Sequence, residues 1–209
     1  KMNLSLQESS RQLSRLKEEK LLKKNDTGHY YLTPYGRAVL CIILNQQFLV
    51  KNCDYFLKHT LSKMHSEHIS RIGELNQSIR IKKIMNVIEL IEASIQRASQ
   101  EIILICDQIL TRTISAIELK SHDGVDCTLF LADVIYSRFF EKLRSCKIKK
   151  LPLKDIQTFL LLTEREAIVS FPDVSGNLDY SEVFYAQDEK SRKWCYDLFI
   201  HYSKFRCLH

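Results

Sequence analysis

The sequence has little glycine and proline and contains no long apolar run. It has 5 Gly and 3 Pro among 209 residues, of which 45% are hydrophobic. These numbers exclude a collagen-like repeat and a low-complexity disordered chain. The longest uninterrupted apolar run, residues 38–44, is far shorter than the ~20 residues that span a bilayer. We therefore expect a folded soluble chain of one or two domains with no membrane span.

Paired cysteine motifs are also missing. The chain has 7 Cys, an odd number, with no C-x-x-C pair and no secretory signal ahead of them. This usage favours reduced thiols and a cytoplasmic location. The neighbouring residues favour core positions for the cysteines, and a redox role for one of them stays open. They are Cys41, Cys53, Cys106, Cys127, Cys146, Cys195 and Cys207.

The 7 histidines form no recognisable metal-binding pattern. The best groups are His65 with His68, and His201 with Cys207 and His209, and neither has the spacing of a four-ligand zinc site. Residues 173–179 resemble a calcium-binding loop but lack its closing acidic residue, so we expect a tight turn there. We predict neither a bound metal ion nor a cofactor.

What the sequence does have is an excess of basic residues near its start. Lys and Arg number 31 against 25 Asp and Glu, a net charge of +6. Residues 1–37 hold eight basic and four acidic side chains, so +4 of that charge lies there. Such a patch is typical of a nucleic-acid-binding surface or of an ordinary solvated one, and the fold decides between them.

The elements expected at the start of the chain fit half of a winged helix. Ser5 and Glu8 have the spacing of a capping box, which predicts a helix ending near Lys20. Residues 21–24 and 29–33 are extended runs around a polar turn and predict a β-hairpin. A complete winged helix has further helices ahead of this one, so we expect the natural N-terminus to be missing from this sequence.

A single uninterrupted helix is expected over residues 37–60, with two apolar stripes. One stripe would cover its own domain, and the second would pack on a partner helix from another subunit or on the rest of the same chain. We favour a homodimer. The first stripe is Val39, Ile42, Leu49, Cys53 and Phe56, and the second is Leu40, Leu44, Phe48 and Tyr55.

The remainder of the chain predicts an α/β sandwich. A polar helical connector is expected over residues 62–75, and a second domain from residue 76. Strands alternate with helices, and the strand–helix–strand order predicts a parallel pair of strands. The expected strands are 101–106, 125–131, 147–153, 157–163 and 166–171, and the expected helices are 84–98, 111–120, 133–146 and 188–205.

The first helix and the hairpin carry side chains suited to reading double-stranded DNA. Arg can pair with guanine and Gln with adenine, while Ser, Lys and Thr bond to base edges or phosphates. The alternative is a solvated polar face. The candidate residues are Gln7, Ser10, Arg11, Gln12, Ser14, Arg15, Lys23, Lys24, Asn25, Thr27, His29 and Tyr30.

Two stretches carry a family resemblance that covers nearly the whole chain. Residues 9–16, followed by 31–36, resemble the recognition helix and wing of archaeal winged-helix transcription regulators. Residues 159–173 and 194–199 resemble the effector half of the methanogenesis and filamentation regulator type. The resemblance implies a phospholipase-D-like domain, yet no His here begins an H-x-K-x(4)-D motif. We therefore expect no enzyme activity, since no other catalytic constellation is evident either.

The residues and the resemblance together predict a mixed α+β and α/β chain in three parts. These are a partial winged helix (1–36), a dimerisation helix with its connector (37–75) and an α/β sensor or assembly domain (76–209). The predicted function is a dimeric, cytoplasmic transcription regulator that binds double-stranded DNA, with a small-molecule effector left open. The alternatives are a module that contacts the transcription machinery and a phosphodiester hydrolase.

Overall fold

A helix and a β-hairpin form the N-terminal end of the molecule. The computed structural model describes residues 5–204. Helix α1 (Leu6–Glu18) begins at Ser5, whose hydroxyl accepts the backbone N–H of Glu8. The antiparallel strands β1 (Leu22–Lys24) and β2 (Tyr30–Leu32) follow. The predicted helix and hairpin are confirmed.

A tight joint connects the hairpin to helix α2 (Pro34–Lys51). The Thr33 hydroxyl accepts the N–H of Gly36 and donates to the carbonyl of Lys20. A Cβ at Gly36 would collide with the carbonyl of Leu21. Glycine is therefore required where the start of α2 packs on Leu21, just ahead of β1, and the hairpin and α2 are held in one orientation.

The predicted single helix over 37–60 is wrong, because the helix breaks at Asn52. Helix α2 ends at Lys51, and the short α3 (Cys53–Phe56) follows. Asn52 has φ −116° and ψ 28°, and its side-chain amide donates to the carbonyl of Phe48. The break turns the chain so that Phe48 and Tyr55 join the core beside the sheet.

The predicted polar connector is wrong as well. Residues 62–75 contain a short helix, α4 (Ser66–Ile69), and the start of a 3-10 helix, η1 (Ile72–Gln77), rather than one polar helix. Ile72, Gly73 and Leu75 are buried. Helix η1 lies between α2 and α8 (Glu189–Lys204), so the side of this segment that packs against those two helices is apolar.

Within residues 5–204, seven strands form one mixed sheet in the order β3-β9-β8-β7-β4-β5-β6. Strands β4, β5 and β6 are parallel to one another, and the other pairs are antiparallel. The parallel pair is therefore confirmed. The strands are β3 (Ile79–Lys82), β4 (Glu101–Cys106), β5 (Asp126–Ala132), β6 (Lys147–Leu151), β7 (Phe159–Thr163), β8 (Ala167–Ser170) and β9 (Glu182–Ala186).

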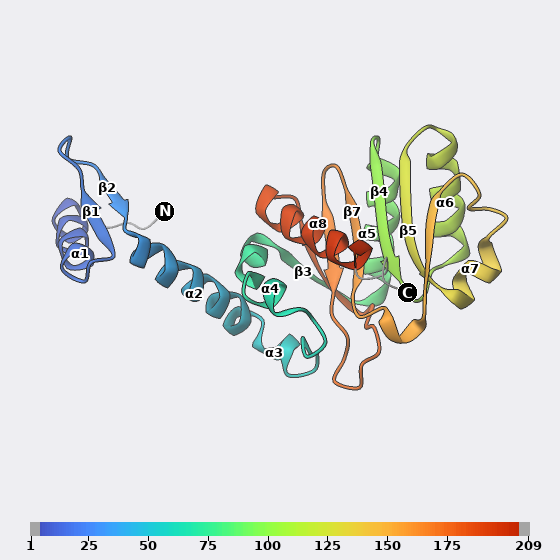
Figure 1. Ribbon diagram of the computed structural model, residues 1–209, viewed down its shortest axis with the longest axis horizontal. Coiled ribbons are helices and arrows are strands. Elements are labelled where there is room, and N and C mark those ends of the chain that lie inside the picture. The colour runs from blue at the N-terminus through green and yellow to red at the C-terminus, as the bar shows by residue number, and fades with distance from the viewer. Residues whose placement is uncertain (1–4, 205–209) are drawn as a thin grey trace.

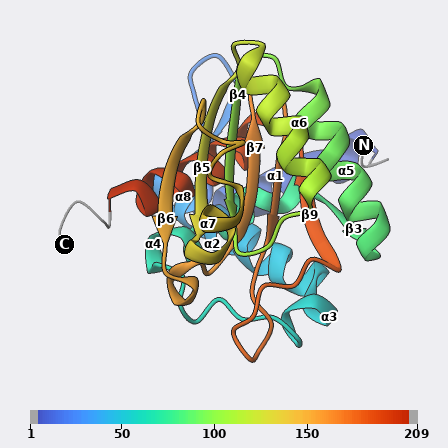
Figure 2. The same ribbon diagram turned by 90° about the vertical axis from the view of Figure 1, so that its right-hand side faces the viewer.

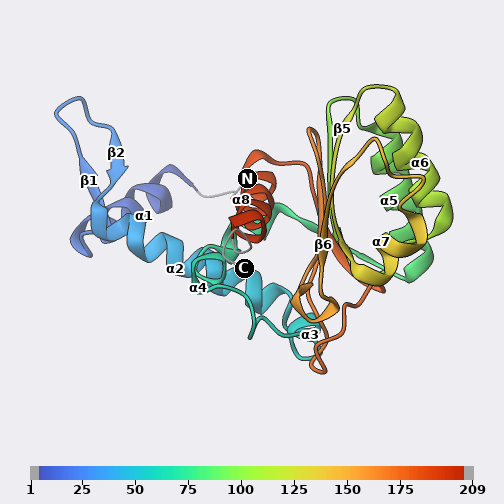
Figure 3. The same cartoon turned by 45° about the vertical axis from the view of Figure 1, so that its right-hand side comes forward.

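Helices cover both faces of this sheet, so the predicted sandwich and fold class are confirmed. One face carries α5 (Ile84–Arg97), α6 (Thr111–His122) and α7 (Asp133–Phe139), and the other carries α8 with η1 (Figures 2 and 3). Strands β3 and β9 were not predicted, and α7 is shorter than the expected helix over 133–146. A short 3-10 turn, η2 (Leu153–Asp155), precedes β7.

Helix α2 projects from the sheet domain and carries α1 and the hairpin at its far end (Figure 1). Its C-terminal part enters the core through Phe48, while Leu40, Ile42 and Ile43 are exposed. In the described part of the chain, none of the helices has both the length and the apolar character required to cross a membrane.

Candidate nucleic-acid interface

One face of α1 presents a row of exposed polar side chains. Gln7, Ser10, Arg11, Ser14 and Arg15 recur at three- and four-residue spacing, which places them on one side of the helix. The Arg11 side chain is 72% exposed and meets Glu8 at 3.7 Å. So exposed an ion pair contributes little to stability, and the guanidinium is available to a partner.

The opposite side of α1 faces the hairpin. Leu13 is half-buried there, whereas Leu6 is 92% exposed. Gln12 is half-buried on this flank, so it lies apart from the exposed polar row. The structure therefore brings together five of the predicted α1 residues on one face and leaves Gln12 at its edge.

The hairpin tip is organised by the side chain of Asn25. Its oxygen accepts the Thr27 hydroxyl at 2.9 Å and the backbone N–H of His29 at 2.7 Å. The left-handed φ of +88° at Gly28 closes the turn. Lys24 lies 5.5 Å from the ring centre of Tyr30. Lys23, Lys24, Asn25, Thr27 and His29 are exposed, and Tyr30 is half-buried.

Side-chain hydrogen bonds fix the projecting helix α2 to the sheet domain. The Asn45 side chain accepts the N–H of Gly73 at 2.6 Å and donates to the carbonyl of Ser70. The Asn76 side chain donates to the carbonyl of Leu44 at 2.7 Å. Helix α2 thus has defined polar contacts with η1, and these set the direction in which α1 and the hairpin point.

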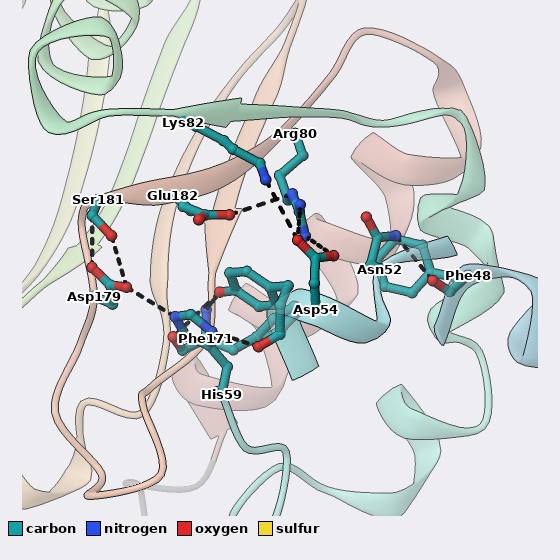
Figure 4. Close-up of polar contacts among 11 residues, drawn as sticks. Phe48, Asn52, Asp54, His59, Arg80, Lys82, Phe171, Asp179, Ser181 and Glu182 are labelled. Carbon is teal, nitrogen blue, oxygen red and sulfur yellow. Dashed lines mark hydrogen bonds and ion pairs between the residues drawn. The ribbon is translucent and has the colours of Figure 1, made fainter. Parts of the chain in front are cut away.

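Figure 4 shows a second polar junction, between α3 and the strands behind it. Arg80 on β3 donates to both carboxylate oxygens of Asp54, and this hydrogen bonding holds the pKa of Asp54 well below its usual range. His59 Nε2 lies 3.0 Å from Asp179 Oδ2. Burial raises the pKa of Asp179, but the hydrogen bonds from Ser181 and His59 outweigh it and lower the pKa overall.

A basic cavity lies on the α8 side of the sheet domain. Its volume is about 750 Å³, within the usual range for small-molecule sites. Residues 63–65, the segment between β6 and β7, and the end of α8 line it. Four lysines contribute to the lining, Lys63, Lys149, Lys150 and Lys154, against a single carboxylate, Asp155. The Lys149 ammonium donates to the carbonyl of Ser203, and the Lys150 ammonium lies 3.9 Å from the ring centre of Tyr136.

Three histidines that belong to two separate groups in the sequence lie together beside this cavity, and two of them, His65 and His201, line it. His65 is the N-cap residue of α4, His68 lies within α4, and His201 comes from α8. Cys207 and His209, the other members of the second group, lie outside the described residues. No sequence spacing signals this cluster, because the fold brings α4 and α8 together.

Neither a protein-family model nor a curated protein matches this sequence. The fold is similar to that of TrmBL2, reported as an archaeal chromatin protein with a novel mode of DNA binding. The TM-score is 0.51 at 14% identity, over 97% of this chain and 83% of TrmBL2. At this identity, the similarity shows a common fold for nearly the whole chain. It agrees with the predicted resemblance in fold, and it does not show the regulator type.

Two further structures match this chain more weakly. NucT from Helicobacter pylori matches with a TM-score of 0.45 at 10% identity, over 63% of this chain and 94% of NucT. The polyphosphate kinase of Porphyromonas gingivalis matches with a TM-score of 0.42 at 18% identity, over 71% of this chain and 28% of the kinase.

The prediction that the chain is not an enzyme does not stand, and catalysis by the sheet domain is no longer excluded. The missing H-x-K-x(4)-D motif excludes one arrangement of catalytic groups, and it does not exclude every reaction on such a fold.

Proposed function

We propose that α1 and the hairpin are the DNA-binding unit of a dimeric transcription regulator of archaeal type. The observation that carries this proposal is the exposed polar face of α1, which lies beside a basic hairpin at the end of α2 farthest from the sheet (Figure 1). A protruding helix of this kind fits the width of the major groove of B-DNA. The DNA-binding mode reported for TrmBL2, which has a similar fold, supports the same assignment.

Each side chain of the unit has a role in this proposal. Arg11 reads base edges, because its guanidinium is exposed in the centre of the polar row. Arg15, Lys23 and Lys24 contact phosphates, which fix the register of the protein on the duplex. The hairpin tip, residues 25–30, enters the adjacent groove. Gln12 contributes at the edge of the contact, since it is half-buried.

The exposed apolar side of α2 is the proposed dimer contact. Ile42 is 66% exposed and Ile43 is 50% exposed, although both lie in the middle of a helix. A second copy of α2 would remove these side chains from water, at about 25 cal/mol per Å² of buried apolar surface. Two copies joined here would present two DNA-binding units to one duplex.

The basic cavity is the proposed effector site of the sheet domain. Its four lysines favour an anionic small molecule, such as a phosphorylated metabolite. Lys63, Met64 and His65 belong to the segment that leads from α3 to α4, so a ligand here touches the region that holds α2. This proposal is independent of whether the sheet domain also catalyses a reaction.

The division at residues 36 and 75 stays a prediction, as does the cytoplasmic location. The burial of Phe48 and Tyr55 in the sheet core bears on the first of these. Because both side chains pack in that core, the later part of the predicted dimerisation segment (37–75) packs with the α/β part of the chain.

DNA binding is tested by fluorescence anisotropy of the full chain with the promoter of its own gene and with unrelated DNA. Arg11→Ala should weaken promoter binding by about 1–3 kcal/mol and reduce the preference for the promoter. The matched control is Arg144→Ala, because Arg144 is also exposed and also pairs with a Glu three residues earlier.

Two outcomes would count against the proposal. If Arg11→Ala binds like the unchanged protein, α1 does not read DNA. If the protein binds no DNA but captures basal transcription factors in a DNA-free pull-down, the interaction-module alternative replaces the regulator.

A further inference from the structure

The three clustered histidines have donor atoms close enough to share one ion. One ring nitrogen from each of His65, His68 and His201 lies within 4.8 Å of the other two. The ring centres of His65 and His201 are 4.8 Å apart, and those of His68 and His201 are 5.2 Å apart. The ring centres of His65 and His68 are 6.5 Å apart, so the three side chains from α4, its N-cap residue and α8 face one small region.

His68 supplies the fixed part of this cluster. It is 2% exposed, its carbonyl accepts the indole N–H of Trp194, and its ring packs edge-to-face on that indole. Its Nδ1 is buried without a hydrogen-bond partner in the described structure. A buried polar nitrogen without a partner is unfavourable, and coordination to a cation would remove that penalty.

The surroundings of two of the rings disfavour the protonated form. Burial lowers the pKa of His68, and burial together with the two neighbouring histidines lowers the pKa of His201. An imidazole nitrogen binds a metal ion only when it is unprotonated.

We propose that His65, His68 and His201 bind a divalent transition-metal ion of the zinc type, with a fourth coordination position open to the basic cavity. In a tetrahedral zinc site with Zn–N bonds of ~2.05 Å, the nitrogens lie about 3.4 Å apart. His65 Nδ1 accepts the backbone N–H of Glu67 at 3.4 Å, which leaves Nε2 as the ligand atom of His65, and binding requires the rings to move closer together than in this structure. Imidazole ligands select zinc, copper or nickel over magnesium and calcium.

The cavity provides the entry path and the fourth ligand. His65 and His201 both line it, so the ion would lie in the cavity wall and contact solvent. The nearby lysines repel a bare cation, and they favour an anion or hydroxide in the open position. The bound ion would tie α4 to α8, and it would stabilise the fold by an amount that grows with free metal concentration.

Metal binding by the full chain tests the proposal, after the protein has been stripped with a chelator. Zn²⁺ binding is measured by competition with a chromophoric chelator, and Co²⁺ is used as a spectroscopic substitute. We expect one ion per chain and visible absorption bands of tetrahedral Co²⁺. His65→Asn and His201→Asn should each weaken Zn²⁺ binding at least about tenfold and remove those bands.

Two controls separate this site from other metal-binding groups. His122→Asn changes an exposed histidine at the end of α6, remote from the cluster, and should bind like the unchanged protein. A Cys41→Ser/Cys53→Ser double variant removes the two thiols that are exposed within residues 5–204 and should also retain the ion. Absence of binding by the unchanged chain, or binding that survives His65→Asn and His201→Asn, would overturn the proposal. The result does not depend on DNA binding.

Discussion

The backbone N–H of Gly73 donates a 2.6 Å hydrogen bond to the side-chain oxygen of Asn45, so η1 lies directly on α2. A Cβ at Gly73 would lie 2.5 Å from the carbonyl carbon of Leu44 and 2.6 Å from the backbone nitrogen of Asn45. The contact is therefore backbone on backbone, and only glycine allows it. The direction of the projecting helix depends on this crossing.

Gly73→Ala should destabilise the protein by about 1–3 kcal/mol, because the new methyl group pushes two backbone segments apart. Urea unfolding followed by circular dichroism measures the change. Gln77→Ala, an exposed change at the end of η1, should stay within about 0.5 kcal/mol of the unchanged protein. Equal stabilities for the two variants would show that the crossing is looser than described.

A buried carboxylate makes the stability of the sheet domain pH-dependent. Glu166 is 2% exposed and accepts hydrogen bonds from Arg97 at 2.9 and 3.0 Å and from the Tyr185 hydroxyl at 2.6 Å. Burial raises the pKa of Glu166, but these hydrogen bonds outweigh it, and the pKa lies below its ordinary value. The stabilisation is present above the unfolded-state pKa of about 4.3 and is lost as the pH falls through the lower folded-state pKa.

Glu166→Gln should therefore cost about 1.5–3 kcal/mol at pH 7 and less under acidic conditions. Unfolding free energies at pH 7 and pH 3 give the comparison, with the exposed Glu89→Gln as the control. The assignment fails if Glu166→Gln loses as much stability between the two pH values as the unchanged protein does.

The proposed dimer contact predicts a change in oligomeric state. Ile42→Glu places a charge in the apolar side of α2 and should convert a dimer to a monomer, because burying an unpaired carboxylate is strongly unfavourable. Light scattering coupled to size exclusion measures the mass. Leu119→Glu alters a side chain of similar exposure on α6 and should leave the dimer intact. If the unchanged protein is itself a monomer, the proposed dimer contact through α2 is wrong.

Local signals in the sequence predicted the N-terminal unit well. The Ser5 cap, the polar turn and the extended runs are short-range features, and each determines its own element with little help from the rest of the chain. The apolar runs of β4, β7 and β8 were recognisable for the same reason. The helix and hairpin predicted at the start of the chain supplied the candidate DNA-binding face.

The missed features depend on contacts between distant residues. The helix break at Asn52 is not a strong local signal, and it is stabilised by burial of Tyr55 against the sheet. Strand β3 has only four residues and exists as a partner of β9, with Ile79 opposite Tyr185. The histidine cluster likewise requires α4 and α8 to be packed together, which no spacing in the sequence reveals.

The most direct test of the DNA-binding account is the salt dependence of binding by a hairpin variant. In the full chain, the slope of log K against log salt concentration should fall in magnitude by about 0.9 in Lys24→Ala, because one phosphate contact is lost. Its affinity should fall equally for promoter and unrelated DNA, while Lys190→Ala on α8 should match the unchanged protein. An unaltered slope and affinity in Lys24→Ala would contradict the account.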